Sequence, residues 1–151
     1  MAAYYDLDSV GKKVVMVGSG LTACEVALHL ANNGRDVTVL CRRDMMAYET
    51  FGYYRNALLD AMDARGIHQI LKTKTLSIAK DGVTVEKDGE TFVVPADTVI
   101  YSTGIRPDAA AVEELKALAG EIPVKVIGDA LASGKMGDAV RGGYMAAMEI
   151  V

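Results

Sequence analysis

The chain has 151 residues, the length of one domain, and 51% of them are hydrophobic, which is enough to build a core. Its formal net charge of −4 argues against nucleic acid or an anionic membrane surface as the main partner. There is no apolar run of about 20 residues that could span a membrane and no signal-peptide pattern. The two cysteines lack CxxC spacing, so we expect a reducing, cytoplasmic setting without disulfides.

The first eleven residues show no clear hydrophobic period. Tyr4, Tyr5 and Leu7 allow two interpretations. They pack on a following sheet, or they belong to a linker from a longer protein. We treat residues 1–11 as an N-terminal extension or linker.

A strand, a glycine turn, a helix and a second strand follow one another between Lys13 and Arg43. Val14–Val17 is an apolar run typical of a strand buried on both faces of a parallel sheet. After Gly18-Ser19-Gly20, a helical spacing of apolar residues begins and continues to Asn33-Gly34, a helix stop. A second buried strand is predicted over Val37–Leu40. This order is the βαβ unit of dinucleotide-binding domains.

The small residues of the turn have the spacing that pyrophosphate binding requires. Gly18 permits a tight turn, and Gly20 lets the backbone approach a pyrophosphate without an intervening Cβ. Ala23 stands at the third position, where a small residue allows close packing of helix and strand. The free N–H groups of the helix then face the phosphates. A purely structural strand–helix turn is the alternative.

The residues after the second strand distinguish between the two nicotinamide cofactors. An NAD-specific unit usually places Asp or Glu there to bind the ribose 2′-OH. This chain has Cys41-Arg42-Arg43 instead, and two guanidinium groups can hold a 2′-phosphate through charge-assisted hydrogen bonds. We therefore favour NADPH over NADH. The alternative is a solvated charge pair on a loop.

These motifs resemble the nicotinamide domain of flavoprotein reductases with two dinucleotide-binding domains. Residues 18–25 match its GxGxxAxE opening, and Cys41-Arg42-Arg43-Asp44 is similar to the HRRD stretch that binds the 2′-phosphate in thioredoxin reductases. A further arginine of that motif would fall at Ala47 and is absent. Since a CxxC is also absent, the chain resembles most the C-terminal reductase half of 2-enoate and 2,4-dienoyl-CoA reductases (NADH:flavin oxidoreductases).

The segment after Arg43 predicts a loop, a helix and a strand. In the loop over residues 44–52, Met45 and Met46 either cover the adenine ring or simply pack the loop. Apolar spacing predicts a helix from Tyr54 to Arg65 and a third parallel strand over residues 67–71. His68 has no partner at a spacing that indicates a metal or acid–base site.

Residues 75–94 change to the two-residue period of strands. Alternating segments are joined by Asp81-Gly82 and Asp88-Gly89, and Asp-Gly between such segments is typical of a hairpin. The pattern predicts a three-stranded antiparallel meander. In the resembled family this meander replaces one crossover helix of the nicotinamide domain and has a structural role.

A strand over Thr98–Tyr101 then returns to the main sheet and ends in a glycine turn at residues 102–108. This turn resembles the family's A-T-G-x-x-P-N motif, which closes the nicotinamide domain beside the cofactor. In open α/β sheets, ligands bind at the carboxyl ends of strands. Arg106 has three alternative interpretations, in which it faces a phosphate, the flavin domain or solvent.

The last part of the chain predicts a helix capped by Asp108, with Val112, Leu115 and Leu118 facing inward, and a short strand over Val124–Ile127. In the resembled family, a strand followed by Gly128-Asp129 belongs to the flavin domain, where the aspartate binds the ribityl chain. A helix over residues 136–149 would lie beneath the flavin. We do not expect FAD binding by this chain alone, because the sequence has no second GxGxxG.

The expected fold is α/β, a Rossmann-like three-layer domain with a parallel central sheet and the meander. The expected divisions are residues 1–11, a NAD(P)-binding domain over residues 12–107, and a helix–strand–helix segment of a flavin domain over residues 108–151. No catalytic residue and no metal ligand are expected. The expected cofactor-binding residues are Gly18, Ser19, Gly20, Leu21, Thr22, Ala23, Glu25, Cys41, Arg42, Arg43, Ser102, Thr103, Gly104, Arg106, Gly128 and Asp129.

The expected function is to position NADPH for hydride transfer to FAD, which other parts of a parent protein would hold, and the isolated chain is expected to be inactive. The expected partners are the FAD-binding and catalytic domains of that parent, with a homodimer through the C-terminal segment as a further expectation. Glu25 either pairs with a basic group of the flavin domain or is an exposed helix carboxylate near the positive end of the helix dipole. The alternative function is a stand-alone, non-enzymatic binding or adaptor domain. A methyltransferase-like domain is disfavoured by the arginines, because it needs an acid after the second strand.

Overall fold

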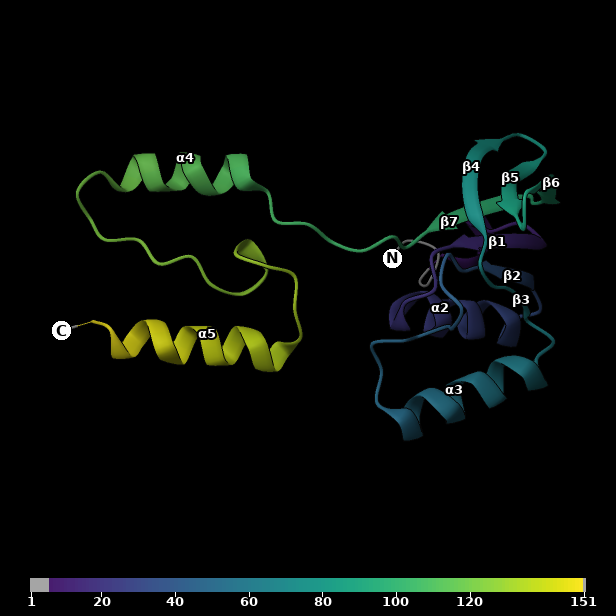
Figure 1. Cartoon of the computed structure of the whole chain (residues 1–151), viewed down its shortest axis with the longest axis horizontal. Coiled ribbons are helices and arrows are strands. Elements are labelled where there is room, and N and C mark those ends of the chain that lie inside the picture. The colour runs from purple at the N-terminus through teal and green to yellow at the C-terminus, as the bar shows by residue number, and fades with distance from the viewer. Residues whose placement is uncertain (1–5, 151) are drawn as a thin grey trace. The chain divides into compact units, whose positions relative to one another are not determined.

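The computed structural model describes residues 6–150, and the chain divides into two compact units, Met1–Thr103 and Gly104–Val151. Tyr4 and Tyr5 lie outside the described residues. In the described residues, unit 1 holds two sheets, two α-helices and one short 3-10 helix, whereas unit 2 holds two α-helices and one short 3-10 helix (Figure 1). No helix of the described part is long and apolar enough to cross a membrane.

The centre of unit 1 is a parallel sheet with the strand order β3-β2-β1-β7. Its strands are β1 (Lys13–Val17), β2 (Asp36–Leu40), β3 (His68–Ile70) and β7 (Thr98–Tyr101). β1 pairs with β2 on one side and with β7 on the other, in register from Val14 to Val17. The predicted parallel sheet is therefore confirmed, and the carboxyl ends of β1, β2 and β7 lie at one edge.

Two helices cover one face of this sheet. α2 (Leu21–Asn32) follows β1, and α3 (Gly52–Ala64) follows β2. Small and apolar side chains of α2 pack into the core because they recur at helical spacing, and the buried ones are Ala23, Cys24, Ala27 and Leu30. Asn33 is the C-cap of α2, and Gly34 follows with a positive φ of 75°, so the predicted helix stop is confirmed.

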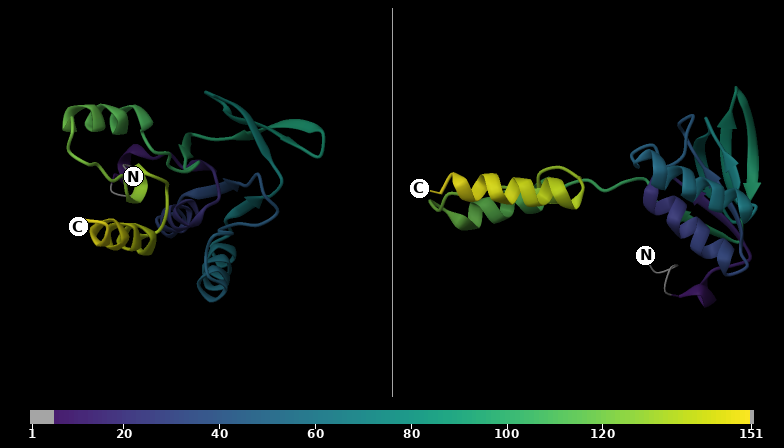
Figure 2. Two further views of the ribbon diagram at one scale, coloured as in Figure 1. Left: turned by 60° about the vertical axis from the view of Figure 1, so that its left-hand side comes forward. Right: turned by 90° about the horizontal axis from the view of Figure 1, so that it is seen from below.

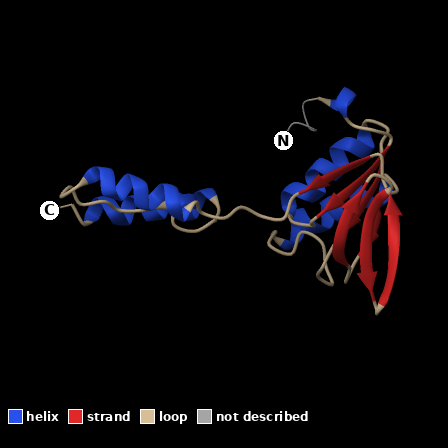
Figure 3. Ribbon diagram, turned by 90° about the horizontal axis from the view of Figure 1, so that it is seen from above, coloured by secondary structure: helices blue, strands red, loops and turns tan. Residues whose placement is uncertain are grey.

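The antiparallel meander covers the other face of the parallel sheet. Its strands are β4 (Lys74–Ala79), β5 (Gly82–Lys87) and β6 (Glu90–Pro95), in the order β4-β5-β6. Successive residues of β1 point to opposite layers, since Val14 and Met16 pack with the helices while Val15 packs with Val83 and Val85 of the meander. Figures 2 and 3 show the three layers of unit 1, and the predicted three-layer fold is confirmed.

The first hairpin of the meander differs from its predicted position by one residue. Ala79 pairs with Gly82, so the two-residue turn is Lys80-Asp81, and Gly82 already belongs to β5. The second turn is Asp88-Gly89 as predicted, and both residues have positive φ values, 54° and 85°.

Residues 6–11 pack against the rest of unit 1. The short 3-10 helix η1 (Leu7–Ser9) precedes Val10, whose side chain is buried. The Arg35 guanidinium donates hydrogen bonds to the carbonyls of Val10 (3.2 Å) and Leu7 (2.7 Å). Of the two interpretations for the N-terminal segment, the described part supports packing against the domain.

Unit 2 contains α4 (Ala109–Ala119), η2 (Gly128–Ala130) and α5 (Met136–Met148). The Asp108 carboxylate accepts a hydrogen bond of 3.1 Å from the Ala111 amide, so the predicted helix cap is confirmed. The predicted inward-facing side of α4 is wrong. Leu115 and Leu118 of α4 are 65% and 78% exposed, and the inward face predicted with Val112 buries no residue.

The predicted strand over Val124–Ile127 does not form. An extended segment becomes a strand only when a neighbouring strand accepts and donates its backbone hydrogen bonds, and residues 123–127 have no such neighbour among the described residues. The prediction of a strand from the apolar pattern is therefore wrong, because the pairing that a strand requires is not present among the described residues.

Candidate dinucleotide site

The glycine turn after β1 lies against the end of β7. Gly18 has a φ of 111°, and a Cβ at this position would lie 2.2 Å from the Ser102 carbonyl oxygen. The Ser102 amide in turn donates a hydrogen bond of 2.8 Å to the Val17 carbonyl. Gly18 is thus required by the fold itself, because only glycine combines this φ with so close an approach of two backbones. The contact brings two predicted site segments together.

Gly20 differs from Gly18, because nothing in the chain requires a glycine there. It is the N-cap of α2 with a φ of −68° and a ψ of 175°, an extended conformation that any residue adopts. No atom lies within 4 Å of the place where its Cβ would be. Gly20 makes no side-chain hydrogen bond to the first turn of α2. The N–H groups of this turn point beyond the N-terminal end of the helix. The turn therefore leaves an open space next to the backbone N–H groups of the first turn of α2, the kind of position where helix N-termini bind anions.

Cys41 joins the glycine turn to the segment after β2. Its side chain is fully buried, and its sulfur accepts a hydrogen bond of 2.8 Å from the Ser19 hydroxyl. The Cys41 thiol also donates to the Met45 carbonyl at 3.3 Å. Cys41 thus fills the space between the turn and the loop and is not exposed to a ligand directly.

The loop over residues 41–50 is held firmly against the glycine turn. The Ala47 amide donates a hydrogen bond of 2.8 Å to the Ser19 carbonyl, and the Arg55 guanidinium donates one of 2.8 Å to the Met46 carbonyl. Met46 is buried in the core, whereas Met45 is 43% exposed. The loop-packing interpretation therefore holds for Met46, and Met45 remains accessible at the site.

Arg42 and Arg43 are both exposed on this loop. The guanidinium carbon of Arg43 lies 3.7 Å from the centroid of the Tyr48 ring, a cation–π contact. Neither arginine forms an ion pair with a carboxylate among the described residues. Their charges are thus available to an anion bound next to the loop.

Glu25 lies one turn into α2 and is exposed. Its carboxylate accepts a hydrogen bond of 2.7 Å from the Tyr54 hydroxyl of α3. This bond to the carboxylate raises the pKa of Tyr54 above its ordinary value. Glu25 is exposed, but neither of the two interpretations expected its contact with Tyr54, and its role at the site stays a prediction.

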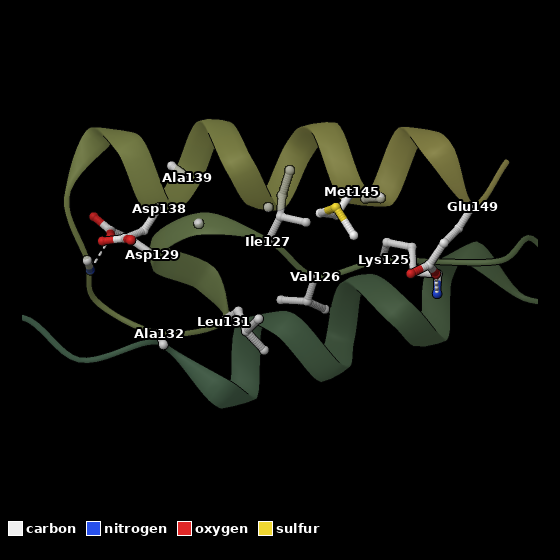
Figure 4. A pocket seen from close by; sticks show the side chains of 14 residues that line it. Lys125, Val126, Ile127, Asp129, Leu131, Ala132, Asp138, Ala139, Met145 and Glu149 are labelled. Carbon is white, nitrogen blue, oxygen red and sulfur yellow. Dashed lines mark hydrogen bonds and ion pairs between the residues drawn. The ribbon is translucent and has the colours of Figure 1, made fainter.

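Four of the predicted site residues belong to unit 2. Gly128 and Asp129 form η2 and line a cavity of about 300 Å³ next to α5 (Figure 4). The Asp129 carboxylate accepts a hydrogen bond of 3.1 Å from the Gly134 amide, and Lys125 pairs with Glu149 at the other end of the cavity. Arg106 is exposed.

The structure brings together the predicted residues of unit 1 around the glycine turn. The grouped residues follow the carboxyl ends of β1, β2 and β7 or form the first turn of α2, and they are Gly18, Ser19, Gly20, Leu21, Thr22, Ala23, Cys41, Arg42, Arg43, Ser102 and Thr103. Glu25, also predicted, lies further along α2. Gly104, Arg106, Gly128 and Asp129 lie in unit 2. Sequence reasoning missed Tyr48 and the role of Tyr54, because neither aromatic residue belongs to a motif. No group of residues that could bind a metal occurs in the described part.

Comparison with known proteins identifies the family. The family described as pyridine nucleotide-disulphide oxidoreductase matches residues 2–128. This chain belongs to that family. An NADH oxidase of Thermoanaerobacter brockii is 31% identical over 140 residues, which are 92% of this chain and 21% of that protein. A ferredoxin–NADP reductase of Ignicoccus hospitalis is 34% identical over 103 residues, 64% of this chain and 32% of that protein.

A solved structure shows the same fold. The structure of a 2-naphthoyl-CoA reductase complex superposes with a TM-score of 0.81 at 24% identity, over 98% of this chain and 23% of that chain. This family member thus spans between about a fifth and a third of the length of the proteins named here.

Proposed function

We propose that this chain is the NAD(P)H-binding part of a flavin-dependent oxidoreductase, with NADPH preferred over NADH. The bound nicotinamide supplies a hydride for transfer to a flavin, and the protein binds and orients it. Unit 1 would hold the dinucleotide at the carboxyl ends of β1 and β2. Residues 12–107 would form the nicotinamide domain, and residues 108–151 would belong to a flavin domain. The setting we propose is the cytoplasm.

Gly20 carries the proposal. Its conformation suits any residue and its surroundings leave room for a side chain, so the fold permits a glycine there but does not require one. A pyrophosphate approaching the first turn of α2 does explain it, because a Cβ would fill the space that the phosphates need. Leu21, Thr22 and Ala23 would then donate backbone hydrogen bonds to the phosphates.

The preference for NADPH rests on the end of β2. The family leaves the choice open, since the relatives named above include an NADH oxidase and a ferredoxin–NADP reductase. Here Arg42 and Arg43 are exposed and make no ion pair in the described part, and no carboxylate directly follows β2. Two guanidinium groups favour a 2′-phosphate, whereas a carboxylate would repel it.

The flavin partner is inferred from unit 2. Asp129 is exposed in the wall of the cavity, and one of its carboxylate oxygens is bound to the Gly134 amide, which leaves the other for a hydroxyl of the ribityl chain. Unit 2 also exposes large apolar side chains, Leu131 in the cavity wall and Val140 and Tyr144 elsewhere on α5, at 64–67%. We propose that FAD and the flavin domain of a longer protein cover this face, with a homodimer as the other occupant to test.

The absence of CxxC from the sequence favours the reductase half of a 2-enoate or 2,4-dienoyl-CoA reductase within the family. The second candidate function is a binding or adaptor domain without redox work. The exposed apolar face of unit 2 speaks against it, because a protein that works alone would present a polar surface there.

Calorimetric titration of the chain with NADPH and NADH, at low and moderate salt, tests this function. We expect binding of both, tighter for NADPH and weaker with added salt. Gly20→Ser should lower the affinity for both by about tenfold or more, because its side chain enters the pyrophosphate space. Serine is a favoured N-cap, so the thermal stability of this variant should not fall.

The double variant Arg42→Ala/Arg43→Ala should bind NADPH and NADH equally. Lys80→Ala/Lys87→Ala removes the same charge from the meander and should keep the NADPH preference. Equal binding of both cofactors by the unaltered chain would show that the arginines are surface charges. Unchanged affinity in Gly20→Ser would refute the dinucleotide site, and binding of neither cofactor would favour the adaptor function.

A further inference from the structure

We propose that Tyr48 determines cofactor specificity by holding the Arg43 guanidinium in place for the 2′-phosphate, a role that rests on the proposed NADPH site. The ring centroid of Tyr48 lies 3.7 Å from the guanidinium carbon. At this distance the ring covers one face of the guanidinium, while the N–H donors at its edge stay free. The contact therefore orients the cation and leaves its hydrogen-bonding capacity to a ligand.

The backbone of the loop places this pair next to the pyrophosphate space. Ala47 directly precedes Tyr48, and its amide donates a hydrogen bond of 2.8 Å to the Ser19 carbonyl of the glycine turn. Ala47 has a φ of 47°, a left-handed conformation that turns the chain back at this point. The Lys72 amide binds the Arg43 carbonyl at 2.9 Å, so both ends of the pair are fixed to unit 1.

The contact with Arg43 accounts for a tyrosine at position 48, whereas core packing does not. Its side chain is 40% exposed, whereas the neighbouring Met46 and Ala47 supply the buried contacts of the loop. A long arginine side chain loses rotamer freedom when it binds a phosphate, and a preformed stack on Tyr48 removes part of that loss. Among the described residues, Arg43 stacks on an aromatic ring and Arg42 does not, so the ordered donor of the two is Arg43.

The test measures the ratio of the dissociation constants for NADH and NADPH by calorimetry on the full chain. Because both cofactors share the adenosine and pyrophosphate, the ratio isolates the 2′-phosphate. Tyr48→Leu should lower the ratio by about two- to fivefold, the effect expected for an exposed cation–π contact. Tyr48→Phe keeps the ring and should keep the ratio. In an Arg43→Ala background, Tyr48→Leu should have no further effect on it.

Several results would overturn this role of Tyr48 and leave the NADPH site standing. One is a ratio unchanged in Tyr48→Leu but lowered in Arg43→Ala, which would show that Arg43 needs no stack. Another is an equal loss of NADH and NADPH affinity in Tyr48→Leu, which would place the ring against the shared adenosine. A third is the same loss of ratio in Tyr48→Phe, which would assign the effect to the hydroxyl.

Failure of the proposed function has a different signature. A ratio near one in the unaltered chain, unaffected by Arg43→Ala, would mean that no 2′-phosphate site exists. Binding of neither cofactor would refute the dinucleotide site as well. Either result would also refute the proposed role of Tyr48.

Discussion

Cys24 and Cys41 are both fully buried, but their surroundings give them different roles. Cys24 lies on the inner face of α2 as a small core residue, and burial is the main cause that raises the pKa of its thiol from 9.0 to about 11. Cys41 instead accepts the Ser19 hydroxyl and so stabilises the turn. The atoms around each of the two thiols therefore decide its role.

Cys24 should make stability depend on alkaline pH. Its thiol binds its proton more tightly in the folded chain than in the unfolded one, so stability is complete below about pH 9 and is lost as the pH rises towards about 11. Urea unfolding between pH 8 and 11 should show about 1 to 3 kcal/mol more loss in the unaltered chain than in Cys24→Ala. Cys24→Ala leaves a small cavity and should be less stable at pH 8, so the slopes and not the absolute stabilities are compared. Parallel profiles would contradict the prediction.

The meander shows how an element can depend on the close approach of two backbones. Gly82 opens β5 with a φ of 142°, and a Cβ there would lie 2.1 Å from the Val94 carbonyl oxygen of β6. Gly89 has a φ of 85° in the second turn, but no atom lies within 4 Å of its Cβ position. Gly82 is therefore required because a side chain there has no space, whereas Gly89 is required by its backbone conformation alone.

Gly82→Ala should lower the free energy of unfolding by about 2 kcal/mol or more, because strain and a clash with the neighbouring strand act together. Gly89→Asn is the matched control, since asparagine tolerates the left-handed conformation, and it should lose less than about 1 kcal/mol. Chemical denaturation of both variants measures the difference. Equal losses would show that β6 moves away from a side chain at position 82.

On the scale of the whole molecule, the buried side chains are distributed unevenly. The described hydrophobic residues that are buried all lie between Val10 and Val94, within unit 1. α4 and α5 contain no buried residue. Since most helical stability comes from packing an apolar face, unit 2 has little to stabilise it on its own.

Hydrogen exchange of the full chain should reveal this difference. Peptides from α4 and α5 should exchange at least about tenfold faster than peptides from β1 and β2, because opening a unit without buried contacts requires little free energy. Repeating the measurement at lower protein concentration is the control. Protection of α4 and α5 that grows with concentration would indicate a homodimer through this face, and equal protection of both units at every concentration would contradict the prediction.

Local patterns were sufficient to predict most of unit 1. Val14–Val17, Gly18-Ser19-Gly20 and Ala23 each carry their own signal, because strand period, turn chemistry and helix packing depend on neighbours in the sequence. The prediction for Val124–Ile127 failed for the opposite reason. A strand requires a partner strand, and a segment's own residues do not tell whether one is available.

The sequence by itself determined the βαβ unit, the parallel sheet, the meander and the pair of arginines where a carboxylate would favour NADH. Only the tertiary structure showed that Gly18 is required by the fold while Gly20 is not, and that Tyr48 stacks on Arg43 and Tyr54 binds Glu25. The physical reason is that motifs record spacing along the chain. Contacts between the glycine turn, the following loop and α3 depend on how separate elements come together in space.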